Sequence, residues 1–156
     1  MALVNDDVRF KLAPCGRRSG KTERAKRYLV KAAMRLPGLY FAAAPTRDQA
    51  KRIWWEDLKL MSFSPLLGQR SVSEGELIIR LPNSSQIHVI GLDRPERMEG
   101  IPWAGGVIDE FGNVHEDAWP LNIMPALSTK DPRRPNYKPW CWLIGVPEGL
   151  NHYYKM

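Results

Sequence analysis

Residues 15–22 carry the side chains and glycines of a phosphate-binding loop. They read Cys-Gly-Arg-Arg-Ser-Gly-Lys-Thr. Gly20 lets the backbone pass close to a phosphate, Lys21 can reach terminal phosphates, and Thr22 can ligate Mg²⁺. The strict pattern G-x-x-x-x-G-K-[ST] has glycine where this sequence has Cys15, and here a glycine follows one place later. The sequence predicts a variant loop formed by Gly16, Arg17, Arg18, Ser19, Gly20, Lys21 and Thr22; the alternative is a basic turn that caps a helix.

A second candidate is the apolar segment 105–109, which leads into two adjacent acids, Asp109 and Glu110. Ligands of open α/β sheets bind at the carboxyl ends of the strands, so both acids would face the same crevice as the loop. Asp109 would hold Mg²⁺ through its water shell, and Glu110 would orient and deprotonate an attacking water. Alone, such a pair is typical of a solvated turn. The phosphate-binding loop upstream makes it a candidate catalytic pair.

Hydrophobic patterning predicts the elements that position these segments. Strands alternating with helices indicate an α/β fold with a mostly parallel sheet. Segment 62–73 is predicted to be a loop, and Trp55, off the apolar stripe of its helix, is expected to pack only partly. The predicted strands are 8–13, 39–44, a hairpin of 76–81 and 86–92, 105–109 and 140–146, and the predicted helices are 22–36, 50–61 and a proline-interrupted 118–127.

Composition limits the class of protein. A chain of 156 residues with 44% hydrophobic and 26% charged residues is an ordinary globular mixture of one-domain size, which excludes collagenous and disordered classes. It has no apolar run of the roughly 18 residues that a membrane helix needs, and no secretory signal, so a cytosolic protein without membrane contact is expected. Cys15 and Cys141 lie far apart, which predicts reduced thiols and no zinc site.

The positive charge is concentrated near the amino terminus. Net charge is +6, and residues 9–35 contain ten basic residues and one acid, Glu23. This distribution favours an anionic partner, although a solvated helix face explains the residues after Lys21 equally well.

Four segments together resemble the ATPase domain of the large subunit of tailed-phage terminases, the motor that packages viral DNA. Residues 17–22 are similar to that family's arginine-bearing P-loop, and residues 44–50 to the segment after its second strand. Residues 97–100, leading into 107–110, resemble the approach to its Walker B motif, and residues 145–154 its coupling motif. The segments stand in the family's order, and the likeness runs from about Arg9 to the last residue.

The resemblance implies a P-loop NTPase of the additional-strand catalytic-glutamate type, with helices on both faces of the sheet. It implies ATP and Mg²⁺ as cofactors, and ATP hydrolysis that drives double-stranded DNA into a procapsid. The partners would be DNA, the small terminase subunit and the portal protein, with a homo-oligomeric ring acting in the cytoplasm of the bacterial host. The implied roles are γ-phosphate contact for Arg17, catalytic glutamate for Glu110, coupling for Gly145, Val146 and Pro147, and a finger for a neighbouring subunit for Arg97.

Two of these positions have a weaker basis. Arg97 serves equally well as a surface arginine in a charged loop. Val146 stands where a small polar residue is common in the coupling motif, which argues against a hydrogen-bonding sensor there.

The sequence also departs from the family in length. It stops after the coupling motif, so residues 1–156 are expected to form a partial ATPase domain, incomplete at its carboxyl end and without the nuclease domain. Strand 140–146 is expected between strands 8–13 and 105–109, leaving 8–13 as an uncovered edge prone to aggregation. Two alternatives remain open: a helicase-like P-loop ATPase, and a truncated prophage remnant that binds nucleotide without turnover.

Overall fold

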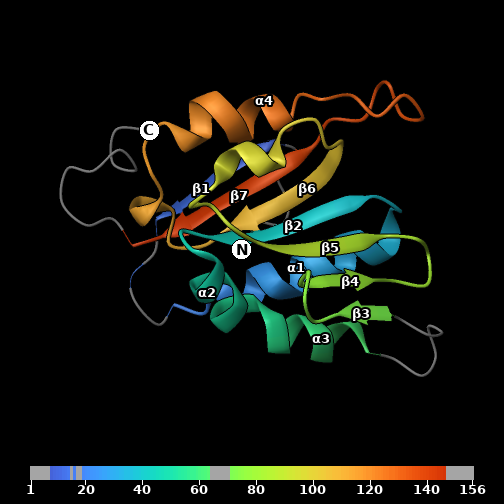
Figure 1. Cartoon of the computed structure of the whole chain (residues 1–156), viewed down its shortest axis with the longest axis horizontal. Coiled ribbons are helices and arrows are strands. Elements are labelled where there is room, and N and C mark those ends of the chain that lie inside the picture. Colours follow the sequence, from blue (N-terminus) through green and yellow to red (C-terminus); the bar gives the residue numbers. More distant parts are fainter. Residues whose placement is uncertain (1–7, 15, 17–18, 64–70, 147–156) are drawn as a thin grey trace.

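The computed structural model describes residues 8–14, 16, 19–63 and 71–146, which form one mixed sheet with helices on both faces (Figure 1). Its strands are ordered β1-β7-β6-β2-β5-β4-β3. Their bounds are β1 Phe10–Pro14, β2 Leu39–Ala44, β3 Ser71–Ser73, β4 Ile78–Arg80, β5 Gln86–Gly91, β6 Trp103–Ile108 and β7 Trp140–Gly145. The predicted α/β class is confirmed.

The first five strands of this order run parallel, and the middle ones are apolar because helices cover both of their faces. All six residues of β6 are buried. β7 lies between β1 and β6, as expected, and pairs Leu143 with Leu12 on one side and with Ile108 on the other. β1 and β3 are the two edge strands of the described sheet.

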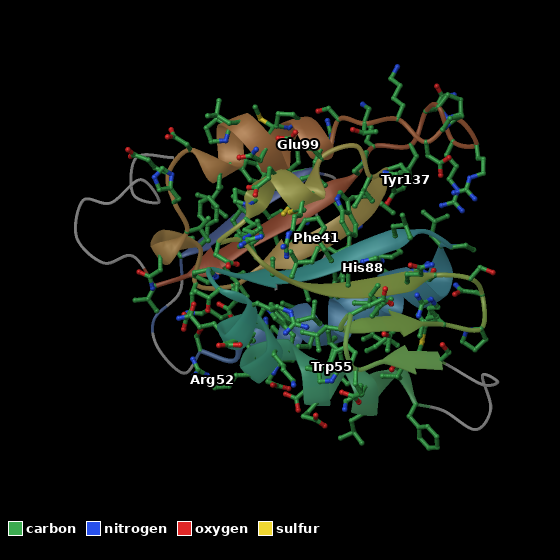
Figure 2. The ribbon with its side chains drawn as sticks, viewed as in Figure 1. Phe41, Arg52, Trp55, His88, Glu99 and Tyr137 are labelled. Carbon is green, nitrogen blue, oxygen red and sulfur yellow. The ribbon has the colours of Figure 1, made fainter. Side chains whose placement is uncertain are left out.

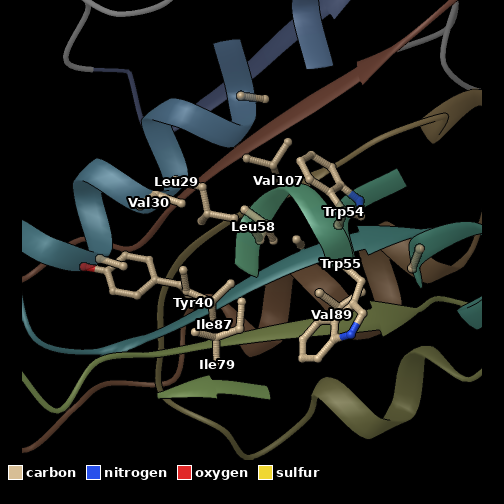
Figure 3. Packing of buried hydrophobic residues seen from close by; sticks show 14 of the residues in the cluster. Leu29, Val30, Tyr40, Trp54, Trp55, Leu58, Ile79, Ile87, Val89 and Val107 are labelled. Carbon is tan, nitrogen blue, oxygen red and sulfur yellow. The ribbon is translucent and has the colours of Figure 1, made fainter. Parts of the chain in front are cut away.

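Two helical segments cover one face of the sheet. α1 (Lys21–Arg35) packs against a continuous helical segment, residues 47–62, which consists of α2 (Arg47–Ala50), the π-helical turn η1 (Lys51–Trp55) and α3 (Glu56–Ser62). Leu29, Trp54 and Val107 belong to the core between these helices and the sheet (Figure 3).

The opposite face carries short helices. They are η2 (Pro95–Met98), η3 (Phe111–Asn113), η4 (Trp119–Ile123) and α4 (Met124–Ala126). A second core, which includes Phe41, Phe111 and Ile123, lies under them. Among the described residues, no helix combines the length and apolar character that crossing a membrane requires.

The predicted hairpin is present, and its turn also holds α1 in place. β4 and β5 pair antiparallel across residues 81–85. Ser85 Oγ donates to the carbonyl of Ala33 at 2.6 Å, and Asn83 Nδ2 donates to the same carbonyl at 2.8 Å. These side chains satisfy carbonyls that the end of a helix leaves without intrahelical partners.

Two predictions need correction, and a third is confirmed with added detail. Residues 71–73 were expected in a loop but form β3, an antiparallel partner of β4; a three-residue strand is too short to show a period. Trp55 is fully buried rather than partly packed, because tertiary packing buries it beside Trp54 in the π turn η1 although it lies off the apolar stripe. The predicted proline-interrupted helix of 118–127 is present, and it consists of the π turn η4 followed by the short α-helix α4.

The structure describes one of the two cysteines. Cys141 is a free, fully buried thiol whose pKa is raised by burial. Cys15 lies outside the described residues.

Gly106 makes room for an aromatic ring in the middle of the sheet. A Cβ at this position would lie 2.5 Å from the Phe41 ring. We predict that Gly106→Ala lowers the free energy of unfolding by about 1–3 kcal/mol, because overpacking shifts rigid neighbours. Gly75→Ala is the matched control, since no atom lies within 4 Å of its added Cβ. Urea unfolding tests both variants, and equal midpoints would contradict the prediction.

His88 lies on β5 (Figure 2) and is half-buried. Its ring packs edge-on against Trp103, and its Nε2 lies 3.0 Å from Gln86 Oε1. Burial, with a smaller effect of Arg80, lowers the pKa of His88 to about 4 from its ordinary 6.5. The unfolded chain therefore takes up this proton first, and stability is lost as the pH falls from about 6.5 towards about 4.

The free energy of unfolding of the wild type should fall between pH 7 and pH 5. We predict that this fall is smaller by about 1 kcal/mol in His88→Gln, a value reduced for partial solvent screening. His115→Gln is the control, because His115 is exposed. Urea unfolding at the two pH values provides the test. If the stability of His88→Gln depended on pH as that of the wild type does, the lowered pKa of His88 would not be the cause of the stability loss at low pH.

Candidate functional site

The carboxyl ends of three parallel strands meet at one edge of the sheet. Pro14, the last residue of β1, is the register partner of Gly145, the last residue of β7. β6 ends beside them, with Ile108 paired to Leu143. The arrowheads of β6 and β7 point to the same side of the molecule (Figure 1). The predicted coupling glycine and the predicted acidic pair therefore lie at the side of the sheet where the predicted phosphate-binding segment begins.

The residue before α1 has a backbone conformation that favours glycine. Gly20 is the N-cap and has the left-handed conformation, with φ 71° and ψ 11°; a residue with a side chain would be strained there. The first helical hydrogen bond runs from Arg24 N–H to the Gly20 carbonyl at 3.1 Å. The N–H groups of Lys21, Thr22 and Glu23 precede it and point out of the positive end of the helix, which favours an anion there.

Thr22 and Asp109 are in direct contact. Thr22 Oγ1 donates a hydrogen bond to Asp109 Oδ2 at 2.7 Å, although the residues are 87 positions apart in the chain. Strand alternation places Asp109 on the same face as Val107, which is the α1 face. The structure thus brings together the two segments that the sequence singled out.

Asp109 is held at two further points. Its backbone N–H donates to the carbonyl of Ala43 at 2.9 Å, and its Oδ1 accepts from the N–H of Glu110 at 2.7 Å. Its exposed fraction is 5%. The carboxyl group is therefore fixed in position and turned towards the first turn of α1.

Glu110 differs from its neighbour in both backbone and exposure. Its φ of 51° and ψ of 39° are left-handed, a conformation that costs a non-glycine residue of order 1–3 kcal/mol and is found disproportionately at functional sites. The turn separates the acids, so that Asp109 is buried and Glu110 is exposed. The Asp109 carboxyl group is thus placed for a fixed contact, and the Glu110 carboxyl group for contact with solvent or a ligand.

The other predicted site residues lie in different parts of the chain. Gly16, Ser19 and Gly20 are exposed, and Lys21 is half-buried. Arg97 is exposed on η2, which packs against η4 on the face opposite α1. Gly145 is buried and Val146 half-buried, whereas Cys15, Arg17, Arg18 and Pro147 lie outside the described residues.

The sequence does not predict that one buried residue, Trp54, is hydrogen-bonded to the backbone beside this site. Trp54 Nε1 donates to the carbonyl of Ala43 at 3.0 Å, the same carbonyl that receives the N–H of Asp109. In the sequence Trp54 is one member of an apolar helical stripe. Its spacing predicts burial, but no sequence pattern predicts which carbonyl its N–H meets.

The donor set fits Mg²⁺. Hydroxyl and carboxyl oxygens are ligands that this cation accepts, and Mg²⁺ usually takes the rest of its shell from phosphate and water rather than from an all-protein cage. Within residues 8–14, 16, 19–63 and 71–146, no group of three or more His, Cys, Asp or Glu side chains could hold a metal ion by itself. Thr22 and Asp109 could therefore hold the cation together with a phosphate ligand.

Comparisons with known proteins identify the fold. The ATPase domain of the Thermus phage P74-26 large terminase matches 99% of this chain with a TM-score of 0.79 and 25% identity. The large terminase of the thermophilic bacteriophage D6E matches 96% of it with a TM-score of 0.73 and 20% identity. The Phi-28 gp11 DNA packaging motor matches 96% of it with a TM-score of 0.55 and 14% identity.

The chain therefore has the fold of the ATPase domain of phage large terminases. It covers 66% of the P74-26 chain, 36% of the D6E chain and 50% of the gp11 chain. The D6E protein has also been solved in complex with ADP and with ATP-γ-S. No protein-family profile matches the sequence, and no curated protein is significantly similar to it.

The contact between Thr22 and Asp109 can be tested through stability. We predict that Thr22→Val lowers the free energy of unfolding by about 1–2 kcal/mol, because a buried carboxyl oxygen loses its hydroxyl donor. Thr22→Ser keeps the hydroxyl and is the control. Denaturant midpoints measure both variants, and a valine variant as stable as the serine variant would show that the bond contributes nothing.

Proposed function

We propose that this chain is the ATPase part of a viral DNA-packaging motor, which hydrolyses ATP to move double-stranded DNA into a procapsid. The observation that carries the proposal is the 2.7 Å contact between Thr22 and Asp109 at the amino end of α1, within the fold of large-terminase ATPase domains.

ATP would bind with its phosphates at the amino terminus of α1. The loop of residues 16–22 would surround them, with Lys21 reaching the terminal phosphates and Arg17 contacting the γ-phosphate. Thr22 and Asp109 would hold Mg²⁺ beside the phosphates. When bound, this cation neutralises charge on the β- and γ-phosphates.

Hydrolysis would be an in-line attack of water on the γ-phosphorus. The new bond joins the water oxygen to phosphorus, the bond from phosphorus to the β–γ bridging oxygen breaks, and the products are ADP and phosphate. Glu110 would orient the water and accept its proton. The exposed Glu110 side chain beside the buried Asp109 supports this division of roles, and catalysis would come from positioning and charge stabilisation.

Coupling of hydrolysis to movement would run through β7. Gly145 lies beside Pro14, the last residue of β1 before the proposed phosphate-binding loop, so a shift at the start of the loop would reach Gly145 directly. This adjacency supports the assignment of Gly145, Val146 and Pro147 as the coupling element. Arg97 remains a weaker candidate for a finger acting on a neighbouring subunit.

The remaining parts of the proposal concern assembly. The chain would be a partial ATPase domain of a longer motor protein that forms a homo-oligomeric ring with the portal protein and the small terminase subunit. It would act on DNA in the cytoplasm of the infected bacterium. Contacts to DNA phosphates would give strong salt dependence and little sequence preference.

Two substitutions test the proposed chemistry. We predict that Glu110→Gln lowers ATP turnover at least about 100-fold while nucleotide binding persists, because the general base is lost. Lys21→Ala should abolish binding or hydrolysis. Glu116→Gln, at another exposed acid close to Glu110 in the chain, is the control and should keep wild-type turnover.

Turnover is measured as phosphate release, and binding as the fluorescence of a labelled ATP. Wild-type turnover in Glu110→Gln would remove the assignment of the base. Full activity in Lys21→Ala would remove the phosphate-binding loop. A wild-type chain that binds ATP without turnover would favour the non-catalytic alternative.

A further inference from the structure

The carbonyl of Ala43 accepts two hydrogen bonds from different parts of the chain. The backbone N–H of Asp109 donates to it at 2.9 Å as part of the parallel pairing of β2 with β6. The indole Nε1 of Trp54 donates to it at 3.0 Å from the helical segment that follows β2. A carbonyl has two lone pairs and can accept both.

This carbonyl lies at the end of the β2–β6 pairing. Ala43 and Ile108 are the last register pair, and the chain then turns at Glu110 with a left-handed backbone. The ends of a strand pairing open more readily than its middle. A second donor at this position ties the end of the pairing to the helical layer, just where Asp109 must be held.

The sequence adopts an unusual helical turn that buries Trp54. η1 is a π turn, and π turns inside α-helices occur mostly as single turns and frequently at functional sites. Both Trp54 and Trp55 are fully buried within it, and Figure 3 shows both side chains in the core. Trp55 Nε1 donates to Glu74 Oε2 at 2.7 Å, so the two adjacent indoles donate to different parts of the molecule.

We propose that Trp54 is a positioning residue for Asp109. By holding the Ala43 carbonyl it fixes the backbone of Asp109, and thereby keeps the Asp109 carboxyl group aligned with Thr22 for Mg²⁺. The proposal rests on the proposed function in one respect, the role of Thr22 and Asp109 towards Mg²⁺. Partners that bond directly to a metal ligand typically change metal affinity or activity 10- to 100-fold when mutated. Trp54 acts one hydrogen bond further out, through the Ala43 carbonyl, so an effect at the lower end of this range is expected.

The adjacent tryptophan provides a matched control. Trp54→Phe and Trp55→Phe each remove one buried indole N–H and keep an aromatic ring. Each also leaves the accepting group with another donor. The Ala43 carbonyl keeps the Asp109 N–H, and the Glu74 carboxylate keeps Lys59 Nζ at 2.8 Å on its other oxygen, Oε1. A general packing defect would therefore affect both variants, whereas loss of positioning would affect only Trp54→Phe.

The first measurement needs no nucleotide. Hydrogen exchange by NMR reports the protection of the Asp109 amide in the whole chain. Trp54→Phe should speed exchange of this amide at least about fivefold relative to both the wild type and Trp55→Phe, because the end of the β2–β6 pairing opens more often. Unchanged exchange would overturn the positioning role, whatever the chain does with ATP.

The second measurement is the Mg²⁺ concentration that half-saturates the Mg²⁺-dependent part of labelled-ATP binding. Trp54→Phe should raise it about 10-fold, with binding in EDTA unchanged, and Trp55→Phe should match the wild type. Equal shifts in both variants would show a packing effect and overturn the proposal. A wild type whose ATP binding ignores Mg²⁺ would instead refute the proposed Mg²⁺ site.

A second variant covers the case in which Trp54→Phe does not fold. Benzothienylalanine at position 54 keeps the shape of tryptophan and replaces its N–H with sulfur. It should give the same faster Asp109 exchange and the same Mg²⁺ shift. Wild-type behaviour of this variant would show that the shape of the ring, and not its hydrogen bond, is what position 54 requires.

Discussion

The hydrogen bond from Thr22 to Asp109 is the constraint on which the rest of the site depends. It joins the first turn of α1 to the end of β6 at 2.7 Å, across 87 positions of sequence. The contact requires that the strand before α1 and the strand before Asp109 end at one edge of the sheet. The parallel pairing of β1 with β7 and of β7 with β6 satisfies this requirement, and Gly145 at the end of β7 lies beside the end of β1.

Burial and backbone geometry then give the two acids separate tasks. Asp109 is fixed by its backbone bond to Ala43, by the Glu110 N–H and by Thr22. The left-handed backbone at Glu110 is accompanied by exposure of the Glu110 side chain at the surface. Because Ala43 is also bonded to Trp54, the position of Asp109 depends on the helical layer as well as on the sheet. Rigid elements thus hold one carboxyl group and leave the other accessible.

Much of this arrangement could be predicted from the sequence, and the exceptions have physical causes. Continuous apolar runs give β2, β6 and β7, and the glycine, lysine and threonine of residues 20–22 mark the start of α1. The spacing of apolar residues does not reveal the π turn. Trp54 and Trp55 are both buried in it through tertiary packing, which an apolar spacing along the sequence does not encode. The left-handed backbone of Glu110 likewise depends on neighbouring strands, and β3 is too short to carry a pattern.

The most direct test of the account is a double-mutant cycle on Mg²⁺-dependent ATP binding, with Thr22→Val, Asp109→Asn and the double variant. If the two side chains form one cation site, each single variant should lose most of the Mg²⁺-dependent affinity, and the double variant should lose little more. Losses that add as independent contributions would contradict the central claim.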